Sequence, residues 1–315
     1  MDKKKASTRE AYGKTLVELG KKHPNVVVLD ADLSSSTKTS LFGKQFPDRF
    51  FDLGVAEQDM ISTAAGIASC GKIVFASTFA VFGSGRAWDQ VRVSVAYTRL
   101  NVKIVVTHGG ITTGEDGATH QATEDIAIMR ALPNMMVIVP ADATETAKVI
   151  KELAKVHGPC YVRLSRLATP VIHENENYDF KIGKGIVLKD GKDVTIFACG
   201  IMVAEALNAA EELGKEGIKV RVVDIHTIKP IDKELIVKCA NETGAVVTAE
   251  EHSIIGGLGG AVAEVLGENA PVPMVRVGIK DMFGESGKPA ELLEKYGLTS
   301  KEIISAVKTV IKRKK

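Results

Sequence analysis

Short runs of β-branched and aliphatic residues alternate with longer helical segments along the first half of this chain. Six such runs occur, at residues 26–29, 50–53, 73–75, 102–107, 136–139 and 160–164. Runs this short and this apolar are typical of strands buried on both faces, and strands separated by helical crossovers pair in parallel. The pattern predicts an α/β fold that begins with a six-stranded parallel sheet covered by helices on both faces.

Two helices of this first unit carry start signals. The sequence Ser-Thr-Arg-Glu at residues 7–10 fits a capping box, and Asp142 with Glu145 fits a second one. In a capping box the first side chain accepts a hydrogen bond from a backbone N–H that the new helix leaves unpaired. We therefore expect a helix from residue 7 to about residue 20, and a crossover helix over residues 142–156.

The pattern changes after residue 165. Residues 166–181 contain Pro170 and a polar stretch, which is typical of a connection between domains. Residues 185–198 then predict a β-hairpin that turns at Asp190-Gly191, and a hairpin makes the second sheet mixed. We expect a first domain at residues 1–168, a linker at 169–184 and a smaller α/β domain with a mixed sheet at 185–315.

Composition narrows the class of protein. With 315 residues, 45% of them hydrophobic, the chain can bury a core, and its net charge is only +2. Its lysine clusters lie at the two ends without alternating aromatic residues, so we expect no nucleic-acid partner. No continuous apolar stretch is long enough for a membrane helix or a signal segment, so we expect a cytoplasmic protein without a membrane partner. Four widely separated cysteines predict reduced thiols and no metal site made by this chain alone.

A long polar interruption lies at residues 108–125, between the fourth strand run and a helical segment. It contains His108, His120 and several acidic residues. A strand-to-helix connection normally needs only a few residues, so a connection of this length and polarity indicates function.

Other unusual residues also follow the predicted strands. They are Asp32 and Ser36 after the first strand, Glu57 after the second, Phe79 and Phe82 after the third, and Ser165 and Arg166 after the sixth. Any one of them has a plain structural explanation: Glu57 can stabilise a helix start, and two phenylalanines three apart are usually core. Because ligands bind beyond the carboxyl ends of parallel strands, their common position predicts a binding site there.

Two of these stretches resemble motifs of thiamine-diphosphate enzymes. Residues 52–58, Asp-Leu-Gly-Val-Ala-Glu-Gln, resemble the glutamate motif shared by several such families. Thr107-His108, followed by Gly-Glu-Asp-Gly-Ala-Thr-His-Gln at 114–121, is similar to the longer and more specific transketolase signature. The resemblance runs from about residue 8 to the end, over the pyrimidine-binding and C-terminal domains of transketolase.

The resemblance implies roles for the residues at the strand ends. Glu57 would bond N1′ of the aminopyrimidine and so favour the tautomer that removes the thiazolium C2 proton. Phe79 and Phe82 would surround that ring, and Asp32 would lie close to the thiazolium. His108 and His120 would contact sugar oxygens and assist proton transfer, and Asp116 would contact a substrate hydroxyl. Arg9, Ser36 and Arg166 would hold the sugar phosphate, for which guanidinium geometry is well suited.

Two departures from the family pattern stand out. The family has an aromatic residue three positions after the second phenylalanine, where this chain has Gly85, and two positions around His120 carry alanine in place of proline. The family also anchors the cofactor diphosphate through a divalent metal, Mg²⁺ or Ca²⁺, at a Gly-Asp-Gly motif that this sequence lacks. The resemblance therefore implies the C-terminal subunit of a split transketolase of the pentose phosphate pathway. Its partners would be a separate N-terminal subunit, sugar phosphates and further copies of itself.

Three alternatives remain open at this point. A 1-deoxyxylulose-5-phosphate synthase-like enzyme shares an Arg-Ala-aromatic-Asp-Gln run like residues 86–90, and a 2-oxoacid dehydrogenase β subunit shares the two-domain plan. The glycines at 256–260 suggest a non-catalytic, nicotinamide-binding protein, but Val262 stands where that fingerprint needs its third glycine. We interpret this run as the start of a helix, and His252 as a capping or interface residue.

Overall fold

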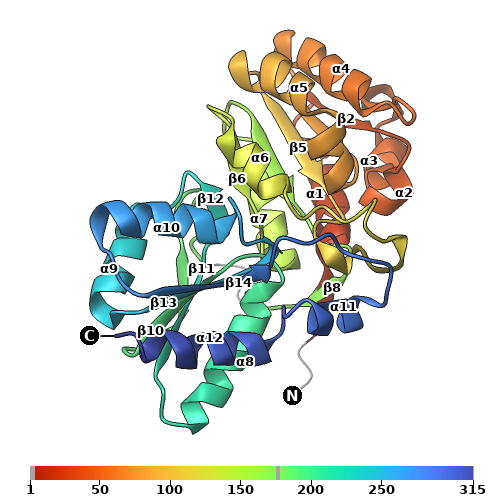
Figure 1. Cartoon of the computed structure of the whole chain (residues 1–315). Coiled ribbons are helices and arrows are strands. Elements are labelled where there is room, and N and C mark those ends of the chain that lie inside the picture. The colour runs from red at the N-terminus through yellow and green to blue at the C-terminus, as the bar shows by residue number, and fades with distance from the viewer. Residues whose placement is uncertain (1–3, 175–177, 315) are drawn as a thin grey trace.

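The computed structural model describes residues 4–174 and 178–314 and contains two α/β bodies that pack side by side (Figure 1). The first sheet has seven strands in the order β12-β6-β7-β5-β4-β2-β3. Six of them are the strands expected from the sequence, and all six pair in parallel: β2 (Val26–Asp30), β3 (Phe50–Asp52), β4 (Ile73–Ser77), β5 (Val102–Val106), β6 (Met136–Ile138) and β7 (Cys160–Arg163).

The seventh strand corrects the expectation of a six-stranded sheet. β12 (Thr227–Lys229) comes from the second half of the chain and pairs antiparallel with β6, with Thr227 opposite Ile138. Without it, β6 would be an edge strand with unpaired backbone groups. Three residues are too few to give a strand signal in the sequence, so this pairing is decided by packing between the two halves.

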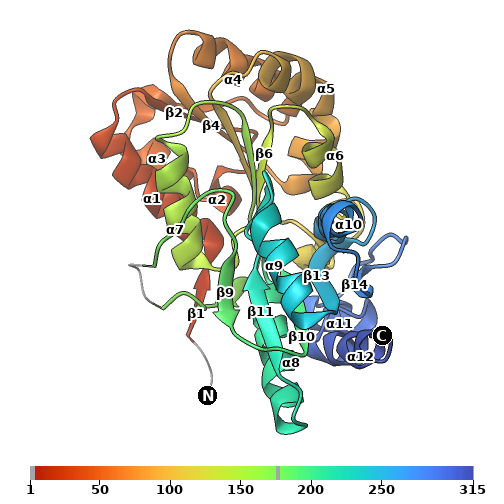
Figure 2. The ribbon, with the colours of Figure 1, turned by 90° about the vertical axis from the view of Figure 1, so that its left-hand side faces the viewer.

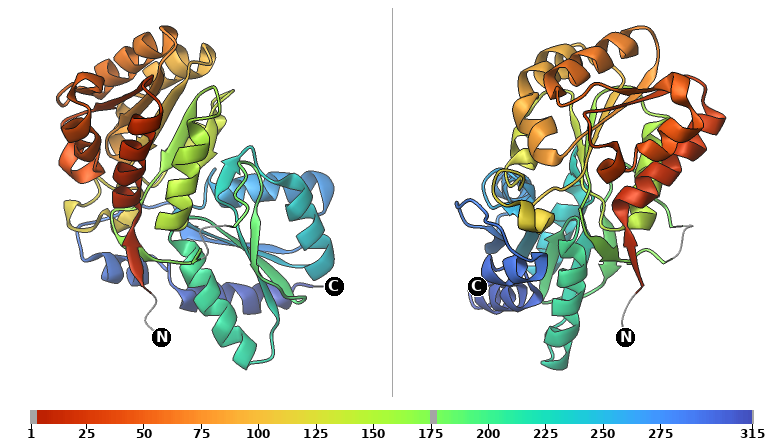
Figure 3. Two further views of the ribbon diagram at one scale, coloured as in Figure 1. Left: turned by 180° about the vertical axis from the view of Figure 1, so that it is seen from behind. Right: turned by 90° about the vertical axis from the view of Figure 1, so that its right-hand side faces the viewer.

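Helices cover both faces of the first sheet, as the sequence pattern predicts. α1 (Thr8–Lys22), α3 (Ser40–Gln45) and α7 (Ala143–Leu153) pack on one face, where Figure 3 shows α1 beside α7. α4 (Glu57–Ser69) and α6 (Asp125–Ala131) pack on the other. Both expected caps form, because the Ser7 hydroxyl accepts from the Glu10 N–H and the Asp142 carboxylate accepts from the Glu145 N–H.

Short helical turns complete the first body. They are α2 (Ser34–Thr37), η1 (Pro47–Arg49), the π-helical turns η2 (Phe82–Arg86) and η3 (Val91–Tyr97) flanking α5 (Trp88–Gln90), and the 3₁₀ turn η4 (Ile111–Asp116).

The second sheet is mixed, but it contains no hairpin at Asp190-Gly191, so that part of the expectation is wrong. Its order is β14-β13-β10-β11-β9, and β9 pairs antiparallel with β11 rather than with β10 (Figure 2). The turn passes across the start of β11, where a Cβ on Gly191 would lie 2.3 Å from the Val220 carbonyl carbon. The strands are β9 (Ile186–Lys189), β10 (Val194–Ala198), β11 (Val220–Asp224), β13 (Val246–Ser253) and β14 (Met274–Ile279).

The second body has its own helices on both faces of this sheet. α8 (Met202–Lys215) and α12 (Ser300–Ile311) pack on one face, and α9 (Lys233–Thr243) and α10 (Leu258–Asn269) on the other. The glycine run at 256–260 opens α10 as expected, and the Glu250 carboxylate accepts from the Leu258 and Gly259 N–H groups at its start. α11 (Pro289–Lys295) lies against η4 of the first body.

The connection between the bodies contains a short strand. β8 (Ala168–Pro170) pairs antiparallel with β1 (Lys5–Ser7) in a separate two-stranded sheet.

All four cysteines are unpaired thiols, and Cys160, Cys199 and Cys239 are buried. None of the helices described for this chain combines the length and the apolar character that crossing a bilayer requires.

Candidate functional site

The loops that follow β2, β3, β4, β5 and β7 meet at the carboxyl edge of the first sheet. The Ala80 N–H donates to the Thr107 carbonyl at 2.7 Å, which joins the third loop to the fourth. The Gly109 N–H donates to the Leu164 carbonyl, and the Asp32 N–H donates to the Asp52 carboxylate at 2.8 Å. The convergence expected from the sequence is therefore present in the fold.

Two phenylalanines and two histidines form a cluster at this edge. The Phe79 ring stacks on His108, with centroids 3.8 Å apart, and Phe82 meets His120 edge-on at 5.2 Å. The two phenylalanine rings are 6.1 Å apart and nearly parallel. Phe79 and His108 are buried, whereas Phe82 and His120 are partly exposed. The partly exposed pair leaves a planar aromatic surface that a ring can contact.

His108 is held in an unusual conformation and in its neutral form. Its φ is 60°, in the left-handed region that few non-glycine residues adopt, and its Nδ1 lies 2.8 Å from the Thr107 hydroxyl. Burial, together with the nearby positive charges of Arg9 and Arg166 and with His120, lowers the pKa of His108 to about 3. A neutral imidazole both donates and accepts hydrogen bonds, as contact with a hydroxyl requires.

The depressed pKa of His108 predicts a loss of stability in mild acid. Between pH 6.5 and about 3 the unfolded chain binds a proton at this position that the folded chain does not. The free energy of unfolding should therefore fall by up to about 1.4 kcal/mol for each pH unit through this group. His108→Asn, which tolerates the left-handed φ, should remove this part of the slope in urea unfolding measured from pH 7 to 4. His157→Asn, at an exposed histidine, is the control, and an unchanged slope in His108→Asn would contradict the assignment.

Glu57 is the first residue of α4, and its side chain is only 1% exposed. The Arg86 guanidinium donates to both of its carboxylate oxygens, at 2.8 and 2.9 Å, and lies 4.5 Å from the Phe82 ring centroid. Arg86 thus connects the buried carboxylate to the aromatic cluster. The sequence did not single out Arg86, although it belongs to the Arg-Ala-Trp-Asp-Gln run.

Arg9 and Arg166, with Ser36, form a cationic corner near His108. Arg9 donates to the carbonyls of Ser36, at 2.7 Å, and Arg166, at 2.9 Å, while its buried Nε has no hydrogen-bond partner among the described residues. Burial lowers the pKa of Arg9, and the nearby Arg166 charge lowers it further. Arg166 in turn pairs with Glu115 at 2.7 Å. Two close guanidinium groups favour the binding of an anion.

Comparison with known proteins fits this geometry. The family model described as "Transketolase, pyrimidine binding domain" matches residues 4–171, and "Transketolase, C-terminal domain" matches residues 183–303. The chain belongs to the transketolase family. A solved structure described as a split gene transketolase, an inactive beta4 tetramer, is 57% identical, has a TM-score of 0.92, and is matched over 98% of this chain and 99% of that one.

Two relatives show how the family divides its chains. A 6-deoxy-6-sulfo-D-fructose transketolase subunit of Clostridium sp. (strain MSTE9) is 49% identical and is matched over 97% of this chain and 95% of its own length. Rat transketolase is 41% identical over 98% of this chain, but the match covers only 49% of the rat protein. The chain thus corresponds to a whole subunit in one transketolase and to about half of another.

Asp32, Asp116 and Gly85 are three further positions that the resemblance singles out. Asp32 and Asp116 are exposed, and over residues 4–174 and 178–314 neither carboxylate forms an ion pair. Gly85 has open space around it, with no heavy atom within 4 Å of the point where a Cβ would lie. The nearest aromatic candidates do not fill it, because Trp88 donates to the Ile128 carbonyl and packs against the core, and Tyr97 is 82% exposed.

Several buried contacts that brace the transketolase signature loop were missed by the sequence reasoning. The Glu251 carboxylate, from β13 of the second body, accepts from the Thr112 N–H at 2.7 Å, and the Gln121 amide donates to the Glu285 carbonyl at 2.9 Å. Arg163 on β7 pairs with Asp125 at 2.9 Å and donates to the Glu251 carbonyl. Arg163 offered a signal that could have been used, because it is a charged residue inside an apolar strand run. A buried charge needs a partner, so this position predicts a buried ion pair. His252 is an interface residue as expected, accepting from the Ala127 N–H of α6 at 3.4 Å.

Proposed function

We propose that this chain is the C-terminal subunit of a two-subunit transketolase that transfers a two-carbon ketol unit between sugar phosphates with thiamine diphosphate. The observation that carries the proposal is the continuous arrangement of a buried carboxylate, an aromatic and histidine cluster and a pair of arginines along one sheet edge. At one end of this arrangement Glu57 pairs with Arg86 at 2.8 Å. At the other end Arg9 donates to the Arg166 carbonyl. A pyrimidine cofactor needs a carboxylate and an aromatic face, and a phosphorylated sugar needs an anion site. This arrangement offers all three.

The residues present fit the cofactor's pyrimidine ring. Phe82, Gly85 and Arg86 belong to one turn, η2. Gly85 has open space around it and the Phe82 ring is partly exposed, so a planar ring can lie against this turn, whose Arg86 contacts the Glu57 carboxylate. In this proposal Phe79 and Phe82 contact the ring, and Glu57 exchanges a hydrogen bond with its N1′. Asp32 lies toward the thiazolium. Thiamine diphosphate supplies a nucleophilic thiazolium carbon when bound. Since Arg86 occupies both Glu57 oxygens, its side chain has to turn away, and its partial exposure of 48% leaves it free to do so.

The remaining residues act on the sugar. His108 and His120 are placed to donate and accept protons at sugar oxygens, with His108 neutral because of its low pKa, about 3. Asp116 contacts a substrate hydroxyl. Arg9, Ser36 and Arg166 hold the terminal anion. A phosphate and the sulfonate of the Clostridium subunit's substrate are both tetrahedral anions, so initial-rate assays with a phosphorylated and a sulfonated donor measure which one this corner prefers.

Arg166→Ala should lower kcat/KM for phosphorylated acceptors by about ten- to a hundred-fold. The reason is the loss of one charge-assisted contact, on the order of 1.5 to 3 kcal/mol. The loss should be smaller for an unphosphorylated acceptor of the same length, measured in parallel. Equal impairment of both acceptors would mean that Arg166 only positions the loop through Glu115, with which it pairs at 2.7 Å.

We further propose that a separate N-terminal subunit completes the site by holding the cofactor diphosphate through Mg²⁺ or Ca²⁺. Support comes from the relatives: one is named as a subunit, one is described as an inactive tetramer of β chains, and rat transketolase is about twice as long. The proposal places the complex in the cytoplasm, in the pentose phosphate pathway, with this chain also contacting copies of itself.

The test is a ketol-transfer assay from xylulose 5-phosphate to ribose 5-phosphate. The purified chain is assayed alone and then titrated with the N-terminal subunit, with thiamine diphosphate and Mg²⁺ present. Activity that appears only on mixing and saturates near one partner per chain supports the proposal. Full turnover and tight magnesium-dependent cofactor binding by this chain alone would overturn the two-subunit arrangement. No transfer in the mixture from any phosphorylated or sulfonated ketose would overturn the transketolase activity itself.

A further inference from the structure

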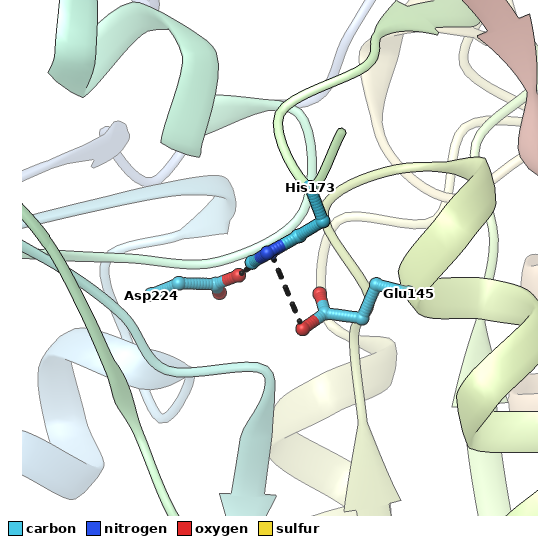
Figure 4. A group of neighbouring side chains, drawn as sticks. All are labelled: Glu145, His173 and Asp224. Atoms are coloured by element: carbon cyan, nitrogen blue, oxygen red, sulfur yellow. Dashed lines mark hydrogen bonds and ion pairs between the residues drawn. The ribbon is translucent and has the colours of Figure 1, made fainter. Parts of the chain in front are cut away.

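A buried group of metal-ligating side chains lies where the two bodies and their connection meet, and the proposed function does not use it. It contains Glu145 from α7, His173 from the connection between the bodies and Asp224 from the end of β11 (Figure 4). His173 Nε2 lies 3.1 Å from Asp224 Oδ2 and 3.6 Å from Glu145 Oε1. The side chains of both acids are 0% exposed, and that of the histidine is 4% exposed. Three segments distant in the sequence thus bring one nitrogen and two oxygen donors together.

The charges of this group do not balance within the protein. Across residues 4–174 and 178–314, neither acid pairs with a lysine or an arginine; their ion-pair contacts are with His173. A protonated imidazole would still leave one of two buried carboxylates uncompensated, which costs several kcal/mol. In addition, Asp224 Oδ1 is buried without a hydrogen-bond partner in the described chain, although the Asp224 carboxylate faces the other two side chains (Figure 4). A buried carboxylate oxygen without a hydrogen-bond partner calls for an explanation, and a bound cation is one that also balances the charge.

We propose that Glu145, His173 and Asp224 bind one divalent metal ion of the zinc class, which clamps the two bodies and their connection together. A divalent ion with a neutral imidazole balances the two carboxylates. Ligand separations of 3.1 and 3.6 Å suit a metal with bonds of roughly 2.0 to 2.2 Å to nitrogen and oxygen. A mixed nitrogen and oxygen set of three donors suits zinc better than Mg²⁺ or Ca²⁺, which need about six or more oxygen ligands.

The surroundings fix these ligands as a metal site requires. Glu145 Oε2 accepts from the Ala141 N–H at 2.7 Å, and Glu145 Oε1 accepts from the Tyr178 hydroxyl at 3.2 Å. The Tyr178 ring stacks on His173 at 4.3 Å, and the Asp142 carboxylate accepts from the His173 N–H at 2.7 Å. Such outer contacts orient metal ligands. The cysteine spacing predicted no metal site, and Glu145, His173 and Asp224 are too far apart in the sequence to show a ligand spacing of their own.

The experiment measures zinc binding to the full chain alone. The protein is stripped with a chelator, dialysed and titrated with Zn²⁺ by calorimetry, and Co²⁺ is added separately to record the visible absorption of the bound ion. We expect one Zn²⁺ per chain and a melting temperature that rises with zinc. Asp224→Asn keeps the shape of the side chain and should weaken zinc binding by at least about 100-fold, since loss of an outer contact alone costs 10- to 100-fold.

Two further variants keep the test decisive. Glu145→Gln retains an acceptor for the Ala141 N–H and should weaken zinc binding similarly, so it replaces Asp224→Asn if that variant fails to fold. His157→Ala, at an exposed histidine, should bind zinc like the wild type. Absence of stoichiometric binding would overturn the proposal and leave protons as the balancing charge. Binding that survives both acid variants would also overturn it, because the zinc would then occupy other histidines. Neither outcome bears on ketol transfer, because no partner, cofactor or sugar is present.

Discussion

Replacing Glu57 with glutamine is expected to lower kcat of the assembled enzyme by roughly 10²- to 10⁴-fold, the range for a positioned acid or base. Glutamine keeps the size of the side chain and its hydrogen bonding, but it cannot exchange a proton with a heterocyclic nitrogen. The side chain is 1% exposed and contacts Arg86, so the change replaces a buried carboxylate. Steady-state kcat with the partner subunit, thiamine diphosphate and Mg²⁺ is the measurement.

The matched control for this variant is Asp59→Asn. Asp59 is the other acidic residue in the first turn of α4 and is exposed, so its substitution changes the charge at the helix start in the same way. Its kcat should stay within about three-fold of the wild type. If Glu57→Gln behaves like this control, Glu57 serves only to stabilise the helix start, and the pyrimidine site lies elsewhere.

The largest expected effect on stability comes from Arg163→Met, which should lower the free energy of unfolding by about 3–5 kcal/mol. The Arg163 side chain is 6% exposed and pairs with Asp125, which is 0% exposed, and it also donates to the Ala122 and Glu251 carbonyls. Removing the guanidinium leaves the buried Asp125 carboxylate without its positive partner, although the Tyr161 hydroxyl still donates to it. Urea unfolding followed by circular dichroism measures the loss.

Two variants separate this mechanism from general damage to the core. Asp125→Asn combined with Arg163→Met removes both charges and should recover part of the loss, as expected for coupled neighbours. Arg221→Met breaks pairs with Asp190 and Glu242, whose carboxylates are 79% and 43% exposed, and should cost about 1 kcal/mol or less. A loss below about 1 kcal/mol for Arg163→Met itself would show that the buried pair is not what holds β7 to α6.

Features that depend on neighbours along the chain could be predicted from the sequence alone. Strand runs bury both faces of a parallel sheet, so an apolar run such as residues 102–107 identifies β5 without knowledge of its partners. The Asp142 cap is equally local, since the residue and its N–H donor are three positions apart. The meeting of the loops that carry Glu57, Phe79 and His108 also followed from the sequence, because parallel strands all end at the same edge.

The contacts between distant segments became clear only in the packed fold. Asp190-Gly191 has the composition of a hairpin turn, yet β11 enters between β9 and β10, and β12 crosses to the first sheet to cover its edge. Likewise, Arg86 meets Glu57, and Asp224 meets His173, across separations that no local pattern records. The physical reason is that strand pairing and charge burial depend on contacts in space. For each such contact the sequence offers many chemically equivalent partners, and only the packing of the whole chain decides which one is used.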